Sequence, residues 1–391
     1  MMYIGWFSFL DSCFLDREDC GIEPMSCAPC PPKEETAAPL QDVVKPTFPF
    51  RLRIVVFTYN RIIGLRRILA SLVSADYPPE ARAAGAISLH IFMDYPKKSL
   101  VAKAGGGPLS SVLDGTRDFL DDFEWPHGPM KIHRREVNMG LKRSIMEGWY
   151  PTKASLGDTP EFCAFFEDDI EVSRHWFTWT DAALRKYAGV GGGTPGGSNK
   201  KVGGNGTYST NRDSKLLGLS LFRPVQDELS GNMSIVDNGD NPFILQQPCS
   251  WGAVYFPWLW REFRQWFADL PPNYDPALTD SSDPGVRPSS NSWPTVSSWK
   301  KYLIQRMHTR GWFMVYPNLP DTMVLSTNHL LQGEHPLPPR RYFELPLYDG
   351  QSDANAALTN LPPLKDMQAF DVMFRSRGKG PSNLPNYLLR A

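Results

Sequence analysis

Three consecutive acidic residues follow an apolar, strand-like segment near the middle of the chain. The apolar segment covers residues 162–166, and Glu167, Asp168 and Asp169 come directly after it. An ionised carboxylate is costly to bury, so acids at the mouth of a buried strand need a cation or hydrogen-bond donors. Carboxylate oxygens suit Mg²⁺ or Mn²⁺, especially where a diphosphate supplies further oxygens. The alternative is a solvated turn, or a helix N-terminus that favours negative charge.

The elements around these acids are predicted from the spacing of apolar residues. Strands are expected at residues 52–58, 87–93, 131–137 and 162–166, and helices over about 62–73, 140–149 and 175–187, the first of them capped by Asn60. Strands that alternate with helices predict an α/β fold, a Rossmann-like mixed sheet flanked by helices.

The positions of the polar residues follow from this topology. Ligands of such sheets bind beyond the carboxyl ends of the strands. Arg61 follows the first predicted strand, Asp94 ends the second and the three acids follow the fourth. We therefore expect Arg61, Asp94 and Asp169 to lie around one cleft at this edge.

The second half of the chain continues the pattern with longer connections. Further strands are expected at about 216–222, 253–256 and 313–316, and helices at 258–267 and 299–309. Residues 188–213 are rich in Gly, Ser, Thr and Asn, and residues 271–294 in Pro, Asp and Ser, so both are predicted to be long surface loops.

The composition argues against a nucleic-acid partner and against a membrane-spanning segment. The 391 residues include 41 basic and 42 acidic side chains, and a net charge of −1 gives no electrostatic footprint for nucleic acid. No segment reaches the roughly 18 apolar residues of a membrane span. Residues 2–10 are apolar but lack a basic flank, so they make a poor signal peptide and membrane association stays undecided.

Cysteines and short motifs add a weak indication of location. Four of the six cysteines lie between residues 13 and 30, without a second pair at zinc-finger spacing. Asn205 and Asn232 begin glycosylation patterns in polar segments, which favours a secretory lumen.

Three segments resemble nucleotide-sugar glycosyltransferases of the A-type fold (GT-A). They are IVVFTYNRIIGLRRIL (54–69), IFMD (91–94) and FEDDIEVS (166–173), and the last is the most specific. The similarity is to the N-acetylglucosaminyltransferase I family with its protein O-mannose-linked relative, and to uncharacterised plant and algal glycosyltransferase-like proteins. It spans about residues 51–260.

The resemblance implies a role for each matching residue. Arg61 and Asp94 are expected to hold the uracil and ribose of a UDP-sugar, because arginine offers planar donors and aspartate can accept from the uracil N3 hydrogen. Asp169 matches the ligand of a Mn²⁺ or Mg²⁺ cofactor, Asp168 the ribose-side acid and Glu167 an acid that touches the donor sugar. Such a metal offsets charge on the leaving diphosphate.

The chain departs from the family at the catalytic base. Inverting members carry a carboxylate just before a tryptophan that corresponds to Trp299, but Ser297 and Ser298 stand there. Asp280 and Asp283, in the preceding loop, are the candidate replacements, and a solvated loop is the alternative. A retaining mechanism or a lost activity would remove the need for this base.

Three further residues complete the predicted site. His329 follows the last core strand and is preferred over His335 as a second metal ligand, with a structural histidine as its alternative. Lys142 is expected to add positive charge near the donor, with a solvated helical face as its alternative. Trp251 is the acceptor-site candidate, because a backbone can approach a ligand closely at the adjoining Gly252, and a place in the core is the alternative for this aromatic group.

These observations lead to one expected function and two alternatives. We expect residues 1–49 to be a mobile leader, 50–360 a glycosyltransferase-like catalytic domain (donor half about 50–187, acceptor half about 214–335) and 361–391 a C-terminal tail. The expected activity is metal-dependent transfer from a UDP-sugar to a carbohydrate or glycoprotein acceptor in the Golgi or another secretory lumen, inverting or retaining. The alternatives are a non-catalytic carbohydrate- or nucleotide-binding protein and a nucleotidyltransferase.

Overall fold

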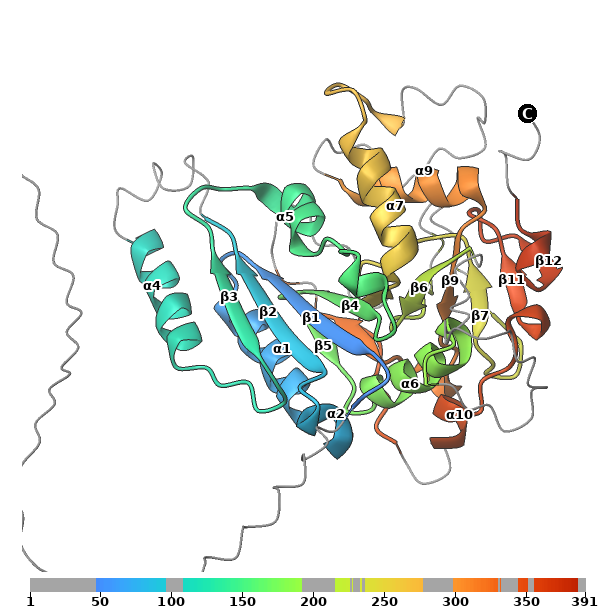
Figure 1. Cartoon of the computed structure of the whole chain (residues 1–391), viewed down its shortest axis with the longest axis horizontal. Helices are drawn as coiled ribbons and strands as arrows, with labels where there is room; N and C mark the ends of the chain where they lie inside the picture. The colour runs from blue at the N-terminus through green and yellow to red at the C-terminus, as the bar shows by residue number, and fades with distance from the viewer. Residues whose placement is uncertain are drawn as a thin grey trace, which may run out of the picture. The chain divides into compact units, whose positions relative to one another are not determined.

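A mixed β-sheet of ten strands organises the part of the chain that the computed structural model describes (Figure 1). The described residues are 47–95, 108–191, 215–225, 227, 233, 236–276, 298–329, 331, 344–350 and 355–385. In sheet order the strands are β12 (Ser376–Lys379), β11 (Gln368–Phe370), β7 (Phe243–Leu245), β9 (Phe313–Tyr316), β6 (Leu216–Ser220), β8 (Ala253–Tyr255), β4 (Glu161–Glu167), β1 (Arg51–Thr58), β2 (Ile87–Met93) and β3 (Met130–Arg134). Helices lie on both faces of this sheet, so the predicted α/β architecture is confirmed.

The four strands β4, β1, β2 and β3 run parallel, and their register aligns their carboxyl ends. Phe57 pairs with Glu167 across β1 and β4, and Thr58 pairs with Met93 across β1 and β2. Strand β8 is antiparallel to β4 and joins this parallel half to the remaining strands. The residues that follow β1, β2 and β4 are therefore brought to one edge of the sheet.

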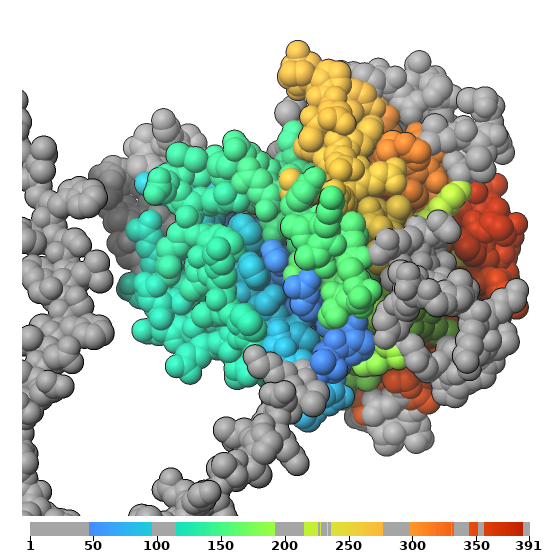
Figure 2. All heavy atoms as spheres, viewed as in Figure 1, coloured from blue at the N-terminus to red at the C-terminus, as the bar shows by residue number. Residues whose placement is uncertain are grey.

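Two apolar clusters cover the two faces, because successive side chains of a strand point to opposite sides. On one face, alternate residues of β1 and β4 pack against α1 (Ile62–Ser74) and α6 (Trp176–Ala183). On the other face they pack against α5 (Gly140–Gly148), α7 (Pro257–Ala268) and α9 (Lys300–Arg310). The space-filling view shows the central strands largely covered by atoms of later segments (Figure 2).

The remaining described elements are short or peripheral. A two-stranded antiparallel sheet joins β5 (Ile170–Val172) to β10 (Ser326–Asn328), directly after the acidic residues. The other helices are α2 (Pro79–Ala83), α4 (Pro108–Asp121) and α10 (Asn355–Thr359), and short 3₁₀ turns cover Ala154–Leu156, Pro320–Thr322, Leu364–Asp366 and Pro381–Asn383. No helix in the described part of the chain is long and apolar enough to cross a membrane.

The structure differs from the sequence-based expectations at several element ends. Arg61, and not Asn60, is the N-cap of α1, and it makes no side-chain capping bond, so the predicted cap is wrong. The helix predicted over 175–187 is α6 followed by a π-helical turn, Leu184–Ala188. The tail after residue 361 contributes two strands, since β11 pairs with β7 and β12 with β11.

A histidine pair on β2 and β3 generates a prediction about pH. The Nδ1 atom of His90 lies 3.1 Å from Nε2 of His133, and the ring of Phe92 stacks on His133 with centroids 4.1 Å apart. Burial, together with neighbouring cations such as Arg53 and Lys131, lowers the pKa of both histidines to about 4.

We predict that the free energy of unfolding falls as the pH drops from about 6.5 towards 4, because the unfolded chain then takes up protons that the folded pair refuses. Thermal denaturation between pH 7 and pH 4.5 checks this for the wild type and for a His90→Gln, His133→Gln double variant. The double variant should lose less of its melting temperature over this range. An equal loss in both proteins would contradict the assignment.

Candidate functional site

Asp168 is the best-anchored residue of the acidic segment. It is buried (1 % exposed) and follows β4, beside the end of β1. The hydroxyl of Thr58 donates to its Oδ2 at 2.8 Å, and the backbone N–H of Tyr59 approaches the same oxygen at 3.4 Å. Its other oxygen contacts a guanidinium nitrogen of Arg61. The carboxylate is thus held by the residues that end β1 and begin α1.

Asp169 shares this arginine but has fewer partners. Nη1 of Arg61 lies 2.8 Å from Oδ2 of Asp169, whereas Oδ1 is buried without a hydrogen-bond partner among the described residues. Burial alone lowers the pKa of Arg61, but the nearby acids outweigh this and the net effect is a raised pKa. One permanently charged guanidinium therefore lies between two carboxylates.

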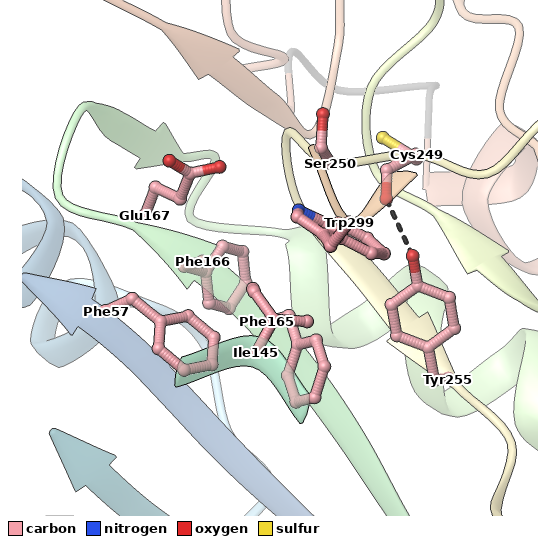
Figure 3. A pocket seen from close by; sticks show the side chains of 9 residues that line it. All are labelled: Phe57, Ile145, Phe165, Phe166, Glu167, Cys249, Ser250, Tyr255 and Trp299. Atoms are coloured by element: carbon pink, nitrogen blue, oxygen red, sulfur yellow. Dashed lines mark hydrogen bonds between the residues drawn. The ribbon is translucent and has the colours of Figure 1, made fainter. Parts of the chain in front are cut away.

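Glu167 is the last residue of β4, and Asp168 lies in the turn that follows it. Together with Ser250, the Glu167 carboxylate lies at the rim of a hollow that is otherwise mostly aromatic (Figure 3). The lining residues are Phe57, Ile145, Phe165, Phe166, Glu167, Cys249, Ser250, Tyr255 and Trp299. Burial and the charge of Asp169 raise the pKa of Glu167 to about 8, against the opposing effects of Arg61 and Lys300.

Asp94 lies at the same sheet edge as Arg61 and Asp169, because the strands that precede them end in register. Its carboxylate accepts hydrogen bonds from the backbone N–H groups of Met139 and Gly140, both at 2.8 Å, and from Nδ2 of Asn138 at 3.2 Å. It therefore caps the N-terminus of α5, where a negative charge is favoured.

A group of lysines near the hollow was missed in part by sequence reasoning. Lys300, the first residue of α9, is only 8 % exposed, and its Nζ lies 5.8 Å from the ring centroid of Trp251. Lys301 forms an ion pair with Asp275 at 2.9 Å. The only sequence signal for Lys300 and Lys301 is that they directly follow Trp299. The resemblance to the family had singled out the residues before this tryptophan, where the family carries an acid.

The predicted Lys142 belongs to the same region as these lysines. Its Nζ lies 5.4 Å from the ring centroid of Tyr302, the residue after Lys301. Burial and then the charge of Lys301 lower the pKa of Lys142. The arrangement concentrates positive charge between the N-terminal parts of α5 and α9.

His329 is close to Asp169 through its backbone, while its side chain has other partners. Its N–H donates to the carbonyl oxygen of Asp169 at 2.8 Å. The imidazole Nε2 lies 2.6 Å from Glu171 and Nδ1 lies 3.1 Å from Glu344. Both ring nitrogens therefore contact carboxylates other than that of Asp169.

The other predicted residues are placed as follows. Trp251 is half-buried and packs edge-to-face on Phe222, with ring centroids 4.9 Å apart, so it contributes to the core as well as to this region. Ser298 precedes the buried Trp299 and carries no carboxylate. Asp280 and Asp283 lie outside the described residues.

The donor atoms around Asp169 are compatible with a divalent cation. No three His, Cys, Asp or Glu side chains of the described part form a ready-made metal cluster. The buried Oδ1 of Asp169 nevertheless lacks a hydrogen-bond partner there, and it is a hard oxygen of the kind that Mg²⁺ binds together with substrate phosphates. The residues thus fit a cation for which a ligand supplies most of the oxygens.

Comparisons with known proteins do not assign the chain. No family model matches the sequence, and no curated protein matches it significantly. Similar solved structures include S. aureus TarS 1–349 in complex with UDP, with 15 % identity over 35 % of this chain and 33 % of that chain and a TM-score of 0.23. Another is TarS 1–349 alone, with 14 % identity over 55 % of this chain and 49 % of that chain and a TM-score of 0.28. A third is the mannosyltransferase PcManGT from Pyrobaculum calidifontis in complex with GDP-Man and Mn²⁺, with 12 % identity over 71 % of this chain and 59 % of that chain and a TM-score of 0.33. The chain covers less than two thirds of each of these proteins, and TM-scores this low identify neither a family nor a ligand.

Gly64 in α1 generates a prediction about how the acids are positioned. A Cβ atom at this residue would overlap the backbone carbonyl oxygen of Asp168 and crowd Leu331. Gly64→Ala should therefore destabilise the protein by about 1–3 kcal/mol, as overpacking does. Without that crowding, a helical Gly→Ala change gains up to about 1 kcal/mol.

Urea denaturation of Gly64→Ala and of a control variant checks this prediction. Gly115→Ala is the matched control, because its Cβ in α4 would meet nothing within 4 Å. The control should be as stable as the wild type or more so. Equal stability of the two variants would show that Gly64 does not set the position of Asp168.

Proposed function

We propose that this protein is a metal-dependent glycosyltransferase that moves a sugar from a UDP-sugar to a carbohydrate or glycoprotein acceptor, in a secretory-pathway lumen. The observation that carries the proposal is the cluster of Arg61, Asp168 and Asp169 at the carboxyl edge of the parallel strands, where Asp94 also lies. Open α/β sheets bind their ligands at this edge. Acids buried there call for a cation, and a diphosphate supplies the remaining ligands.

The nucleotide half of the donor is assigned to Asp94, Arg61 and Asp168. Asp94 already accepts the N–H groups of Tyr95, Met139 and Gly140 and the amide of Asn138, which fill the roughly four lone-pair sites of a carboxylate. The uracil N3 hydrogen is therefore proposed to replace the longest of these bonds, the 3.2 Å bond from Asn138. Arg61 offers a planar fork of donors, which suits base or ribose oxygens. Asp168, which Thr58 holds in position, is the proposed acceptor for a ribose hydroxyl.

The diphosphate is assigned to the neighbourhood of Asp169. A Mn²⁺ or Mg²⁺ ion at this residue would offset the charge that develops on the leaving diphosphate. Asp169 provides the unpartnered carboxylate oxygen for it, and His329 is the second candidate ligand, once its ring leaves Glu171. Lys142 adds positive charge from the start of α5.

The sugar and the acceptor are assigned to the surroundings of the hollow. Glu167 and Ser250 offer polar groups at the rim, where hydroxyl groups of a sugar can be hydrogen-bonded. The hollow itself, about 10 Å³, has room for no more than about one water molecule, so the sugar ring is assigned outside it. Trp251 is the proposed acceptor contact. Asp280 or Asp283 is the proposed base, which must reach the acceptor hydroxyl if the reaction inverts the anomeric centre.

One observation favours a second candidate function, nucleotide or carbohydrate binding without transfer. A serine, Ser298, precedes Trp299 and a buried lysine, Lys300, follows it, so the place of the family's carboxylate base carries no acid among the described residues. A transferase and a binding protein would both bind the donor, but only the transferase would turn it over.

A donor screen followed by a hydrolysis assay tests the proposal. Nucleotide sugars with different bases and sugars are compared by thermal shift, with and without Mn²⁺, because a ligand that binds only the folded state raises its stability. A UDP-sugar should give the largest Mn²⁺-dependent shift, and release of UDP over time would identify a transferase. A selective shift without UDP release, with a range of acceptors present, would favour the binding protein, and no selective shift would refute both.

Asp169→Ala provides the sharpest test at the level of residues. We predict that this variant loses Mn²⁺-dependent binding of the donor, because it removes a charged ligand from a site for a polyanion. Ser298→Ala should bind as the wild type does, within about twofold, since it removes no charge. Isothermal titration of UDP with and without Mn²⁺ measures both variants. An unchanged Mn²⁺ dependence in Asp169→Ala would refute the assignment of the ligand.

A further inference from the structure

The two roles proposed for Arg61 and Asp169 cannot both be filled in the arrangement that the structure shows. Asp169 is the proposed cation ligand, yet Nη1 of Arg61 binds its Oδ2 at 2.8 Å. Arg61 is the proposed nucleotide contact, yet its second terminal nitrogen contacts Asp168. The guanidinium fork is thus already engaged by the two acids before any ligand is present.

We infer that Arg61 is the internal counter-ion of these acids and that it exchanges with the divalent cation. In this exchange the cation takes the carboxylate of Asp169, and the released guanidinium becomes available to the nucleotide. The inference rests on the proposed function, since it assumes that a cation and a nucleotide bind at this edge.

Electrostatics explains why a counter-ion is needed when no metal is bound. Asp168 is 1 % exposed, and the side chain of Asp169 is 13 % exposed. Two buried carboxylates side by side repel each other, and a buried charge that is left uncompensated is strongly destabilising. Arg61 supplies that cation from within the chain, so a metal ion has to compete with an existing ion pair.

The local structure allows the arginine side chain to move while the acids stay in place. Arg61 precedes α1 as its N-cap, and no side-chain capping bond ties it to the helix. Its side chain is 20 % exposed, so it is not fully enclosed by the protein. The backbone at Asp168 is confined by Gly64, and the carbonyl of Asp169 is held by the N–H of His329.

The two acids would respond differently to the loss of Arg61. Asp168 keeps the hydroxyl of Thr58 and the N–H of Tyr59 as donors. Asp169 has no other side-chain hydrogen bond among the described residues, and its Oδ1 is already unpartnered. The carboxylate that most needs a replacement cation is therefore the one assigned to the metal.

This exchange makes cation binding and nucleotide binding thermodynamically coupled. A cation that frees Arg61 raises the affinity for a nucleotide that uses Arg61, and by reciprocity the nucleotide raises the affinity for the cation. A protein in which residue 61 cannot pair with the acids should lose this part of the coupling.

Titration of MnCl₂ alone into the full chain, in the absence of nucleotide, tests the exchange. Arg61→Gln should bind Mn²⁺ more tightly than the wild type by at least about fivefold, the lower end of typical coupling, because no ion pair has to be broken. Arg66→Gln is the matched control: Arg66 is an exposed arginine of the same helix that lies over the ring of Phe119, away from the acids. It removes the same charge and should bind Mn²⁺ as the wild type does.

A second titration with UDP measures the coupling itself. Mn²⁺ should tighten UDP binding by a larger factor in the wild type and in Arg66→Gln than in Arg61→Gln. If Arg61→Gln unfolds, Arg61→Lys replaces it, because a lysine keeps the charge but lacks the fork that joins two carboxylates. Its affinity for Mn²⁺ alone should again exceed that of the wild type.

The outcomes separate this inference from the proposed function. Equal Mn²⁺ affinity in the wild type and the Arg61 variant, with UDP binding still dependent on Mn²⁺ in the wild type, would overturn the exchange and leave the proposed function intact. Absence of Mn²⁺ binding from every variant, with and without UDP, would overturn both the exchange and the metal assignment. An equal gain in Arg61→Gln and Arg66→Gln would reduce the effect to net charge and would also overturn the exchange.

Discussion

The burial of carboxylates at the end of β4 is the constraint on which the arrangement of the site depends. Asp168 has to be satisfied within the fold, and the adjacent end of β1 provides Thr58, Tyr59 and Arg61 for this purpose. The parallel pairing of β1 with β4 places these donors within reach. The contact of α1 with this turn leaves no room for a side chain at Gly64. The turn after β4 is therefore held both by the packing of α1 and by the donors that bind Asp168.

The acidic segment borders two environments, because β4 ends at Glu167 and a turn follows it. Glu167 continues the side of β4 that carries Phe165 and faces the hollow near α5 and α9. Asp168, in the turn, faces Thr58 and Tyr59 at the end of β1 and Arg61 at the start of α1. A ligand that spans the sheet edge can meet a cation-binding, polar environment on one side and an aromatic wall on the other. The charged groups suit the diphosphate of a nucleotide sugar, which is why such a molecule is the proposed substrate.

Much of this edge could be predicted from the sequence because its signals are local. The apolar segments that became β1, β2 and β4 are continuous, and the positions of Arg61, Asp94 and Asp169 follow from the order of strands and helices. The pairing of β5 with β10 and the addition of β11 to the sheet join segments far apart in the chain, and three-residue strands leave no periodic signal. The ion pair of Arg61 with Asp169 and the burial of Lys300 depend on side-chain geometry, which the sequence pattern does not contain.

The central claim is that the acidic edge binds a nucleotide diphosphate together with a divalent cation. Anomalous diffraction from crystals grown with UDP and Mn²⁺ tests it most directly, because manganese can be located independently of the phases of the protein. The account predicts a manganese peak within coordination distance of the Asp169 carboxylate and of the diphosphate, with the uracil beside Asp94. A manganese peak and a nucleotide bound elsewhere, with Arg61 still paired to both acids, would contradict it.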